Sequence, residues 1–282
     1  MRLANLRGRL MVAATGGGFV DLALASEDRF DPDPQLVYER WEEFVAWSAG
    51  ASLGQGEELG VEALGPPVPR PRQIFAIALN YREHAAEGGS EAPTAPQVFT
   101  KFPACIAGPH TAVTLPGAFV DWEAELVVAI GQYAHHVSSA TAWEYVAGVM
   151  VGQDLSARDV QRSGPTPQFS LGKSFPGFGP TGPWLVTRAE FGEGEATIEC
   201  TLNGERVQHA STADMTFPVA DLIAHISSIT PMLPGDLVFT GTPSGVGVHR
   251  TPPVFLRDGD VLVSRIARIG EIRQTFHAPA SS

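Results

Sequence analysis

Several features are scarce in this 282-residue sequence. It contains only two cysteines, Cys105 and Cys200, and they form no CxxC pair, so neither a disulfide framework nor a cysteine-based zinc site is supported. No segment approaches the roughly 20 apolar residues that a membrane-spanning helix needs. The first residues include arginines but no continuous apolar stretch like that of a signal peptide. We therefore expect a cytoplasmic protein with reduced cysteines and no membrane partner.

Basic residues are also scarce, because 19 Lys and Arg stand against 31 Asp and Glu, a formal net charge of −12. Proteins that bind nucleic acids neutralise phosphates with Lys and Arg, so this balance argues against a nucleic-acid partner. It argues equally against docking on an anionic membrane. An acidic protein that binds an anionic substrate needs a local cluster of cations, and such a cluster is therefore worth seeking.

The 30 glycines and 23 prolines are spread along the chain and punctuate many short apolar segments, which predicts a strand-rich fold with few helices. A glycine run between two apolar stretches predicts a hairpin of residues 9–14 and 19–24. Helical spacing of apolar residues predicts helices over 33–48, 140–145 and 219–228. Further strands are expected at 73–79, 126–130, 146–151, 196–202, 237–240, 261–265 and 271–276. The proline-rich stretch 65–72 resembles a stiff linker, so we predict a small N-terminal domain over 1–66 and a larger domain over 67–282.

The sharpest local pattern is a pair of carboxylates, Glu123 and Glu125, at the start of an apolar strand. Residues two apart on a strand point to the same face. Taken alone, such a pair is more often the solvated end of a strand, but a third carboxylate, Asp154, ends another apolar strand. Three buried carboxylates need positive charge, and all-oxygen ligation favours Mg²⁺, Mn²⁺ or Ca²⁺ over zinc. Asp159 is the alternative third ligand, and the spacing does not decide between the two.

A histidine and a glutamate follow the first strand beyond the linker. If this segment is helical, His84 and Glu87 lie on one face, three residues apart. A carboxylate bonded to one imidazole nitrogen fixes the tautomer and makes the other nitrogen a better base. The glycine- and proline-containing stretch after this segment is typical of an active-site lid. A surface pair is the alternative, and the other seven histidines are interpreted as structural.

Three cations, Lys101, Arg158 and Lys173, lie beside these segments and are candidates for the local positive cluster. Spacing alone does not separate them from ordinary solvated side chains. The stretch 240–247, which contains Thr242, follows a strand, and its amides and hydroxyls could hold a carboxylate. A plain turn explains this stretch about as well.

Taken in order, these segments resemble the fumarylacetoacetate hydrolase family over roughly residues 70–276. The segments that carry the resemblance are NYREHAAE, VFTKFP, DWEAELVVAIG, VGQDLSARDVQ, GKSFPGFGPTGPWLV, LNGERVQ and LPGDLVFTGTPSGVG. The first 65 or so residues resemble the smaller, variable N-terminal part of many members. The resemblance implies an α+β fold that is mainly β, a mixed β-sandwich roll with a small N-terminal domain. It also implies a homodimer, or a higher oligomer built from dimers.

The resemblance assigns roles residue by residue. Glu123, Glu125 and Asp154 match the family's ligands for Mg²⁺ or Mn²⁺, with Ca²⁺ as a non-native occupant. His84 and Glu87 match its general-base dyad, with Lys173 as a further catalytic residue. Substrate contacts are implied for Arg158, Gln161 and Thr242. One departure is Pro176, which stands where many members have an aspartate after Lys-Ser-Phe.

The implied reaction is hydrolysis of a carbon–carbon bond in a small 2,4-diketo acid, of the acylpyruvate or fumarylpyruvate type, through an enolate. The same enolate chemistry supports two alternatives on this scaffold: decarboxylation of a 2-keto acid such as oxaloacetate, and isomerisation of a 2-hydroxydienedioate. A binding protein without catalytic activity is a further alternative, which the intact carboxylate triad and dyad disfavour.

Overall fold

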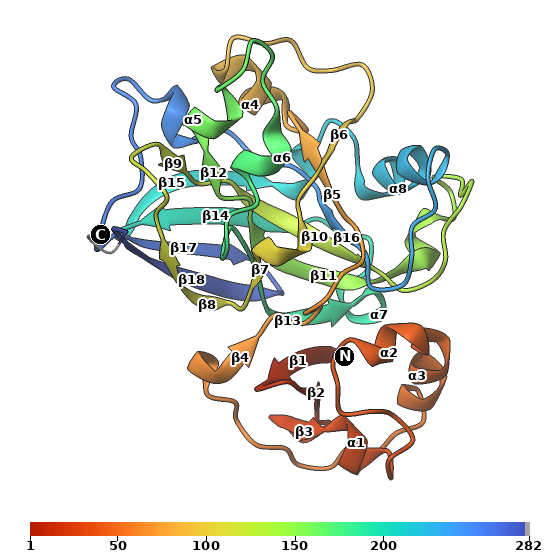
Figure 1. The fold of residues 1–282 in the computed structure, drawn as a ribbon. Coiled ribbons are helices and arrows are strands. Elements are labelled where there is room, and N and C mark those ends of the chain that lie inside the picture. The colour runs from red at the N-terminus through yellow and green to blue at the C-terminus, as the bar shows by residue number, and fades with distance from the viewer. Residues whose placement is uncertain (280–282) are drawn as a thin grey trace.

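Two β-sheets of the chain form one layered core, as seen in a computed structural model that describes residues 1–279 (Figure 1). The fold is α+β and mainly β, as predicted. The large sheet has the strand order β3-β2-β1-β13-β11-β10-β16-β5-β6, with β4 paired to β1 and β7 to β13. Its strands are β1 (Arg2–Leu6), β2 (Arg9–Ala13), β3 (Phe19–Asp21), β4 (Leu64–Gly65), β5 (Ile74–Ala78), β6 (Gln97–Thr100), β7 (Ile106–Ala107), β10 (Ala124–Ile130), β11 (Val146–Gln153), β13 (Gly179–Thr187) and β16 (Leu237–Phe239).

The second sheet has the order β15-β14-β17-β18-β8 and packs against β10, β11 and β13 of the first. Its strands are β8 (His110–Thr114), β14 (Thr197–Leu202), β15 (Glu205–Ser211), β17 (Val261–Ile266) and β18 (Gly270–His277). Two short strands, β9 (Val120–Asp121) and β12 (Ser156–Ala157), pair separately. Because β10 and β11 are covered on both faces, every residue of both strands is buried, which explains their continuous apolar sequences.

The helices are short, and the longest within residues 1–279 has nine residues. They are α1 (Leu22–Ala25), α2 (Leu36–Glu39), α3 (Trp41–Ser48), α4 (Arg82–Glu87), α5 (Arg158–Gln161), α6 (Phe169–Gly172), α7 (Arg188–Phe191) and α8 (Val219–Ser227), with 3-10 turns η1 (Val61–Ala63), η2 (Pro103–Cys105), η3 (Ala142–Tyr145), η4 (Thr212–Asp214) and η5 (Gly247–His249). Within residues 1–279, no helix is both long enough and apolar enough to cross a membrane.

Most of the predicted elements are present, with two corrections. The hairpin is confirmed as β2 and β3, although β3 ends at Asp21 and the rest of the strand expected over 19–24 belongs to α1. Each expected later strand matches β5, β10, β11, β14, β16, β17 or β18. The single helix expected over 33–48 is wrong, because Arg40 has φ −128° and ψ 34° and separates α2 from α3. The helix expected over 140–145 is only the 3-10 turn η3.

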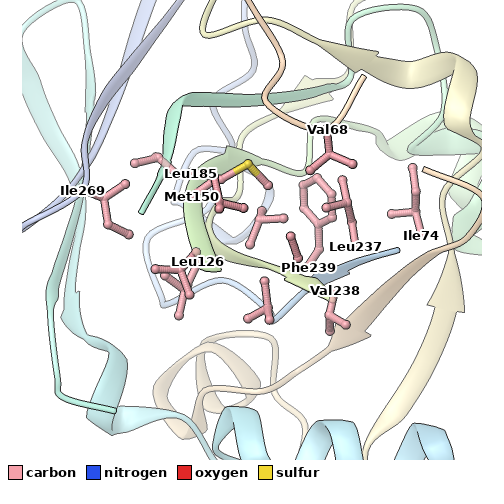
Figure 2. Close-up of a cluster of buried hydrophobic side chains, with 14 of the residues drawn as sticks. Val68, Ile74, Leu126, Met150, Leu185, Leu237, Val238, Phe239 and Ile269 are labelled. Atoms are coloured by element: carbon pink, nitrogen blue, oxygen red, sulfur yellow. The ribbon is translucent and has the colours of Figure 1, made fainter. Parts of the chain in front are cut away.

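The N-terminal segment joins the large sheet directly. Strand β1 pairs antiparallel with β13, with Leu3 opposite Leu185. In Figure 1, β1–β3 and α1–α3 lie together on one side of β13. Val68, in the proline-rich stretch, is fully buried with Ile74 and Leu237 in the apolar cluster of Figure 2. The division into domains 1–66 and 67–282 stays a prediction.

Gly148 provides a test of the packing between β11 and β13. A Cβ atom at this position would lie 2.3 Å from the carbonyl oxygen of Val186, a backbone atom that cannot rotate away. We expect Gly148→Ala to lower the free energy of unfolding by about 1–3 kcal/mol, as overpacked cores do. Gly60→Ala is the control, because a Cβ there meets nothing within 4 Å. Equal midpoints of denaturant unfolding for both variants would contradict this account of the sheet.

Candidate active site

Three buried carboxylates meet at one end of the large sheet. Carboxylate oxygens of Glu123, Glu125 and Asp154 all lie within 4.8 Å of one another. Glu123 precedes β10 and Asp154 follows β11, and these strand ends are joined by the Asp154 N–H, which donates to the Glu123 carbonyl at 2.9 Å. The exposed fractions of the three residues are 6%, 1% and 0%. The antiparallel pairing of β10 with β11 therefore brings together acids that are about 30 positions apart in the sequence.

Two buried lysines bind oxygens of Glu123 and Asp154. Lys101, fully buried, donates from Nζ to Asp154 Oδ1 at 2.6 Å and also to the backbone carbonyls of Lys173 and Phe178. Lys173 donates from Nζ to Glu123 Oε2 at 2.6 Å and to Asp154 Oδ2 at 2.5 Å. Burial opposes the charge of Lys173, but Asp154 and Glu123 outweigh it and raise the pKa of the ammonium. Lys173 therefore stays cationic at neutral pH.

Arg158 connects the triad to the loop after β16. Its Nη2 donates to Glu123 Oε1 at 2.7 Å and to Asp121 Oδ2 at 2.7 Å. The Asp121 carboxylate also accepts the backbone N–H groups of Gly247 and Val248, at 2.7 and 3.0 Å. Asp121 therefore holds both Arg158 and the start of η5 in place, although it does not belong to the triad.

The two glutamates of the triad differ in electrostatic environment. Burial opposes ionisation of Glu123, but the charges of Lys173 and Arg158 outweigh it and hold its pKa well below the usual range. Burial and the neighbouring Asp154 and Glu123 instead raise the pKa of Glu125 well above its usual value. Among residues 1–279, the Glu125 carboxylate accepts one hydrogen bond, from the Gly241 N–H at 2.8 Å. No lysine or arginine of these residues forms an ion pair with it. The Glu125 carboxylate thus lacks the positive charge that ionisation requires.

A divalent cation fits this site. The three carboxylates supply oxygen ligands only, which suits hard ions such as Mg²⁺ and Mn²⁺ and leaves positions for water or substrate. A cation between them would supply the positive charge that Glu125 lacks. Asp159, the alternative ligand, is exposed and accepts a hydrogen bond from the Val160 N–H, so the geometry favours Asp154.

The predicted pair of His84 and Glu87 lies on α4 and is formed. His84 Nδ1 and Glu87 Oε1 are 2.8 Å apart, which leaves Nε2 as the free nitrogen of the imidazole. Glu87 Oε2 accepts the backbone N–H of Gly245 at 2.9 Å. Burial opposes ionisation of Glu87, but these hydrogen bonds outweigh it and lower its pKa. The dyad therefore has an ionised carboxylate that orients the imidazole of His84.

A pocket of about 260 Å³ brings most of the predicted residues together. The predicted residues on its wall are His84, Glu123, Arg158, Gln161, Lys173 and Thr242. The pocket is not lined by Glu87, Asp154 or Glu125. Glu87 and Asp154 bond the lining residues His84 and Lys173, and Glu125 bonds the backbone of the loop after β16. The pocket thus brings His84, one carboxylate of the triad and the cations Arg158 and Lys173 onto one wall.

Gln161 and Thr242 make contrasting contacts in this wall. The Oε1 atom of Gln161 accepts from Arg158 Nη1 at 3.2 Å, and its buried Nε2 has no partner within residues 1–279. The hydroxyl of Thr242 donates to the Ala124 carbonyl and accepts from Gln208 Nε2. Gln161 therefore offers a free donor to a ligand, whereas the hydrogen of Thr242 is already used within the fold.

Sequence reasoning did not single out three residues of this site. Lys101 was only one of several cations beside the motifs, and Asp121 was only the first acid of its motif. His249 was interpreted as structural, yet it lines the pocket with its ring centroid 6.1 Å from that of His84. Burial lowers the pKa of His249, which favours its neutral form. No neighbouring acid in the sequence marks His249, so its only signal was its place after the loop that contains Thr242.

Comparison with known proteins agrees with the class of enzyme that this fold and site define. Residues 73–277 match the model of the fumarylacetoacetate (FAA) hydrolase C-terminal family. The matched region covers the whole site, including both strands that carry the triad. The chain belongs to the fumarylacetoacetate hydrolase family of enzymes.

Individual relatives extend the similarity over the whole chain. The human mitochondrial oxaloacetate tautomerase FAHD2A is 37% identical over 288 residues, covering 96% of this chain and 90% of the relative. A solved structure from Mycobacterium smegmatis, with the provisional name HpcE, is 48% identical with a TM-score of 0.94 and covers 99% of this chain and 100% of its own. Fumarylpyruvate hydrolase from Pseudomonas aeruginosa, solved with Mn²⁺ and pyruvate, is 29% identical with a TM-score of 0.67, covering 74% of this chain and 90% of its own.

Proposed function

We propose that this chain is a divalent-metal-dependent enzyme that moves a proton between carbon and oxygen of a small 2-oxo acid, with oxaloacetate as the candidate substrate. The observation that carries the proposal is the oriented His84–Glu87 dyad facing the same pocket as the buried carboxylate triad. Proton removal next to a keto group requires a positioned base and stabilisation of the charge that develops on the keto oxygen. The name of the human relative, an oxaloacetate tautomerase, supports this reaction.

In this proposal His84 is the base. Its free Nε2 takes the proton from the carbon beside the keto group, while Glu87 keeps the imidazole oriented and stabilises it once it is protonated. The electron pair of the broken C–H bond forms the new carbon–carbon double bond. The imidazolium of His84 then delivers this proton to the keto oxygen, which regenerates the base and gives an enol of the same composition as the keto acid.

Lys173 and Gln161 act on oxygen atoms of the substrate. Lys173 is a buried cation on the pocket wall and stabilises negative charge on the keto oxygen during proton transfer. The unpartnered Gln161 Nε2 binds a further oxygen acceptor of the acid. Arg158 is held by Asp121 and Glu123, and its charge keeps Glu123 ionised.

Glu123, Glu125 and Asp154 would hold the Mg²⁺ or Mn²⁺, which as a Lewis acid would polarise the keto and carboxylate oxygens. We expect chelation with EDTA to abolish activity and added Mg²⁺ or Mn²⁺ to restore it. Calorimetric titration of the chelated protein should show one site for each chain, and this site should be lost in Glu125→Gln. Full activity after exhaustive chelation would remove the metal from the reaction.

The reaction is tested by mixing the enzyme with freshly dissolved oxaloacetate in its enol form. We expect faster decay of the enol's ultraviolet absorbance, with no release of carbon dioxide or pyruvate. Release of carbon dioxide in step with substrate loss would identify a decarboxylase instead. If the enol decays at the buffer rate with metal bound, oxaloacetate is not the substrate.

Hydrolysis of an acylpyruvate or fumarylpyruvate is the second candidate. It is favoured by the similarity to fumarylpyruvate hydrolase, and the same dyad could activate a water molecule for attack on the second carbonyl. Only this reaction releases pyruvate and a second acid in equal amounts. Product analysis with fumarylpyruvate therefore separates it from tautomerisation. Isomerisation of a 2-hydroxydienedioate is recognised by a shifted chromophore without cleavage.

Assembly and location stay predictions. A homodimer is expected from the family resemblance, and light scattering coupled to size exclusion tests it. The human relative is named as mitochondrial, so its name does not support the cytoplasmic location that we expected for this chain. Fluorescence microscopy of a tagged chain in its native cell tests the location.

A further inference from the structure

The inner part of the site is close to charge balance. Three cations oppose four carboxylates there: Lys101, Arg158 and Lys173 against Asp121, Glu123, Glu125 and Asp154. Glu87 is held separately by His84 and the Gly245 N–H. With a divalent cation bound and all four carboxylates ionised, these groups would sum to a single excess positive charge. One carboxylate of a 2-oxo acid neutralises this excess, so the inner site accounts for one carboxylate and no more.

A fourth cation, Arg162, lines the outer part of the same pocket. It is the residue after α5, and its backbone N–H donates to the Arg158 carbonyl at 3.2 Å. Residues four apart on a helical turn share one face, with Cβ atoms about 5–6 Å apart. The guanidinium of Arg158 donates to Asp121, Glu123 and Gln161. The guanidinium of Arg162 has no hydrogen bond or ion pair to any residue in 1–279.

Arg162 is exposed, and its charge has no ion-pair partner within residues 1–279. The acid nearest to it in the sequence, Asp159, accepts the Val160 N–H instead. The neighbouring outer residues of the pocket are Ser90, Gln97, Pro167 and Phe169, none of which is acidic. The residue before Arg162 is Gln161, whose buried Nε2 also lacks a partner within residues 1–279. Because Arg158 can only donate, the Gln161 atom that accepts from it is the carbonyl oxygen, and the amide nitrogen is left free. Two consecutive side chains on this wall thus have donors without a protein acceptor, a buried one on Gln161 and an exposed one on Arg162.

We propose that Arg162 binds a second carboxylate of the substrate, so that the site selects dicarboxylic over monocarboxylic 2-oxo acids. This inference rests on the proposed function. An arginine fork binds a carboxylate through two parallel hydrogen bonds, which suits this role.

The test compares Arg162→Gln with the wild type on two acids. For oxaloacetate, we expect kcat/KM to fall about 10- to 100-fold, which is the range for loss of a charged hydrogen bond. This fall should come from a higher KM, with little change in kcat. For the monocarboxylic 2-oxobutyrate, enolisation is followed by deuterium exchange at carbon 3 and should not change. Arg188→Gln is the control, because Arg188 is exposed on α7 and does not line the pocket. An unchanged KM for oxaloacetate, or equal losses with both acids, would overturn the proposal.

Binding measurements separate this inference from the proposed function. With Mn²⁺ bound, calorimetry should give equal dissociation constants for oxalate in Arg162→Gln and the wild type, because oxalate fills only the inner site. The dissociation constant of 3,3-difluoro-oxaloacetate, a diacid without hydrogen at carbon 3, should rise about 10- to 100-fold in the variant. If the wild type turns over neither acid but this binding difference is found, the proposed reaction fails and the carboxylate site stands. Equal binding of the diacid to both proteins removes Arg162 from recognition.

Discussion

Substitution of His84 by alanine is expected to lower kcat about 10²- to 10⁴-fold, the contribution typical of a positioned general base. The reason is that Nε2 of His84 is the free end of an oriented dyad on the wall of the pocket. Metal affinity should not change, because no atom of His84 contacts a triad carboxylate within hydrogen-bond distance. Turnover of the oxaloacetate enol and titration with Mn²⁺ measure these two quantities on one preparation.

Two further variants make this result specific. Glu87→Gln keeps the size of the partner but removes its charge, so we expect a smaller loss of kcat than in His84→Ala. His249→Asn tests the other imidazole of the pocket. If His249→Asn loses turnover while His84→Ala retains it, the base has been assigned to the wrong histidine.

The largest loss of stability is expected for Lys101→Met. Lys101 is fully buried, and its ammonium bonds Asp154 and two backbone carbonyls. Removing one partner of a buried ion pair typically costs about 3–5 kcal/mol, because the remaining charge and carbonyls stay desolvated. We expect this loss in the free energy of unfolding, measured by denaturant titration in the presence of EDTA.

An exposed ion pair is the matched control. Arg265 bonds Glu271 on the surface of the second sheet, and exposed pairs contribute about 0–1 kcal/mol. Arg265→Met should therefore be nearly neutral. In the double variant Lys101→Met, Asp154→Asn, the cost should be smaller than the sum of the two single costs, because the residues share one interaction. A loss of less than about 1 kcal/mol for Lys101→Met would show that the ammonium is dispensable to the fold.

The sequence was informative where function depends on short segments. Strands β10 and β11 are buried on both faces, and this burial produces the continuous apolar runs that predicted them. The acids that border these runs could therefore be placed at strand ends. His84 and Glu87 are three residues apart on one helix, so their contact follows from local geometry.

Contacts between distant segments were not predictable in this way. Lys101 and Asp154 are separated by 53 positions, and no local pattern distinguishes this lysine from a solvated one. The pairing of β1 with β13 depends on a register between segments more than 180 residues apart. The helix over 33–48 failed for a different reason: its apolar spacing continues through Arg40, but the backbone there leaves the helical region.

The two carboxylate oxygens of Glu87 make different hydrogen bonds, and both bonds depend on the position of α4. Oε1 orients His84, and Oε2 anchors α4 to the Gly245 N–H of the loop after β16. A displacement of α4 from this loop would break the anchor and disturb the base together. The docking of one helix and the orientation of the base therefore depend on a single side chain. A variant that loosens the anchor is expected to lose proton transfer even where the cavity still binds substrate.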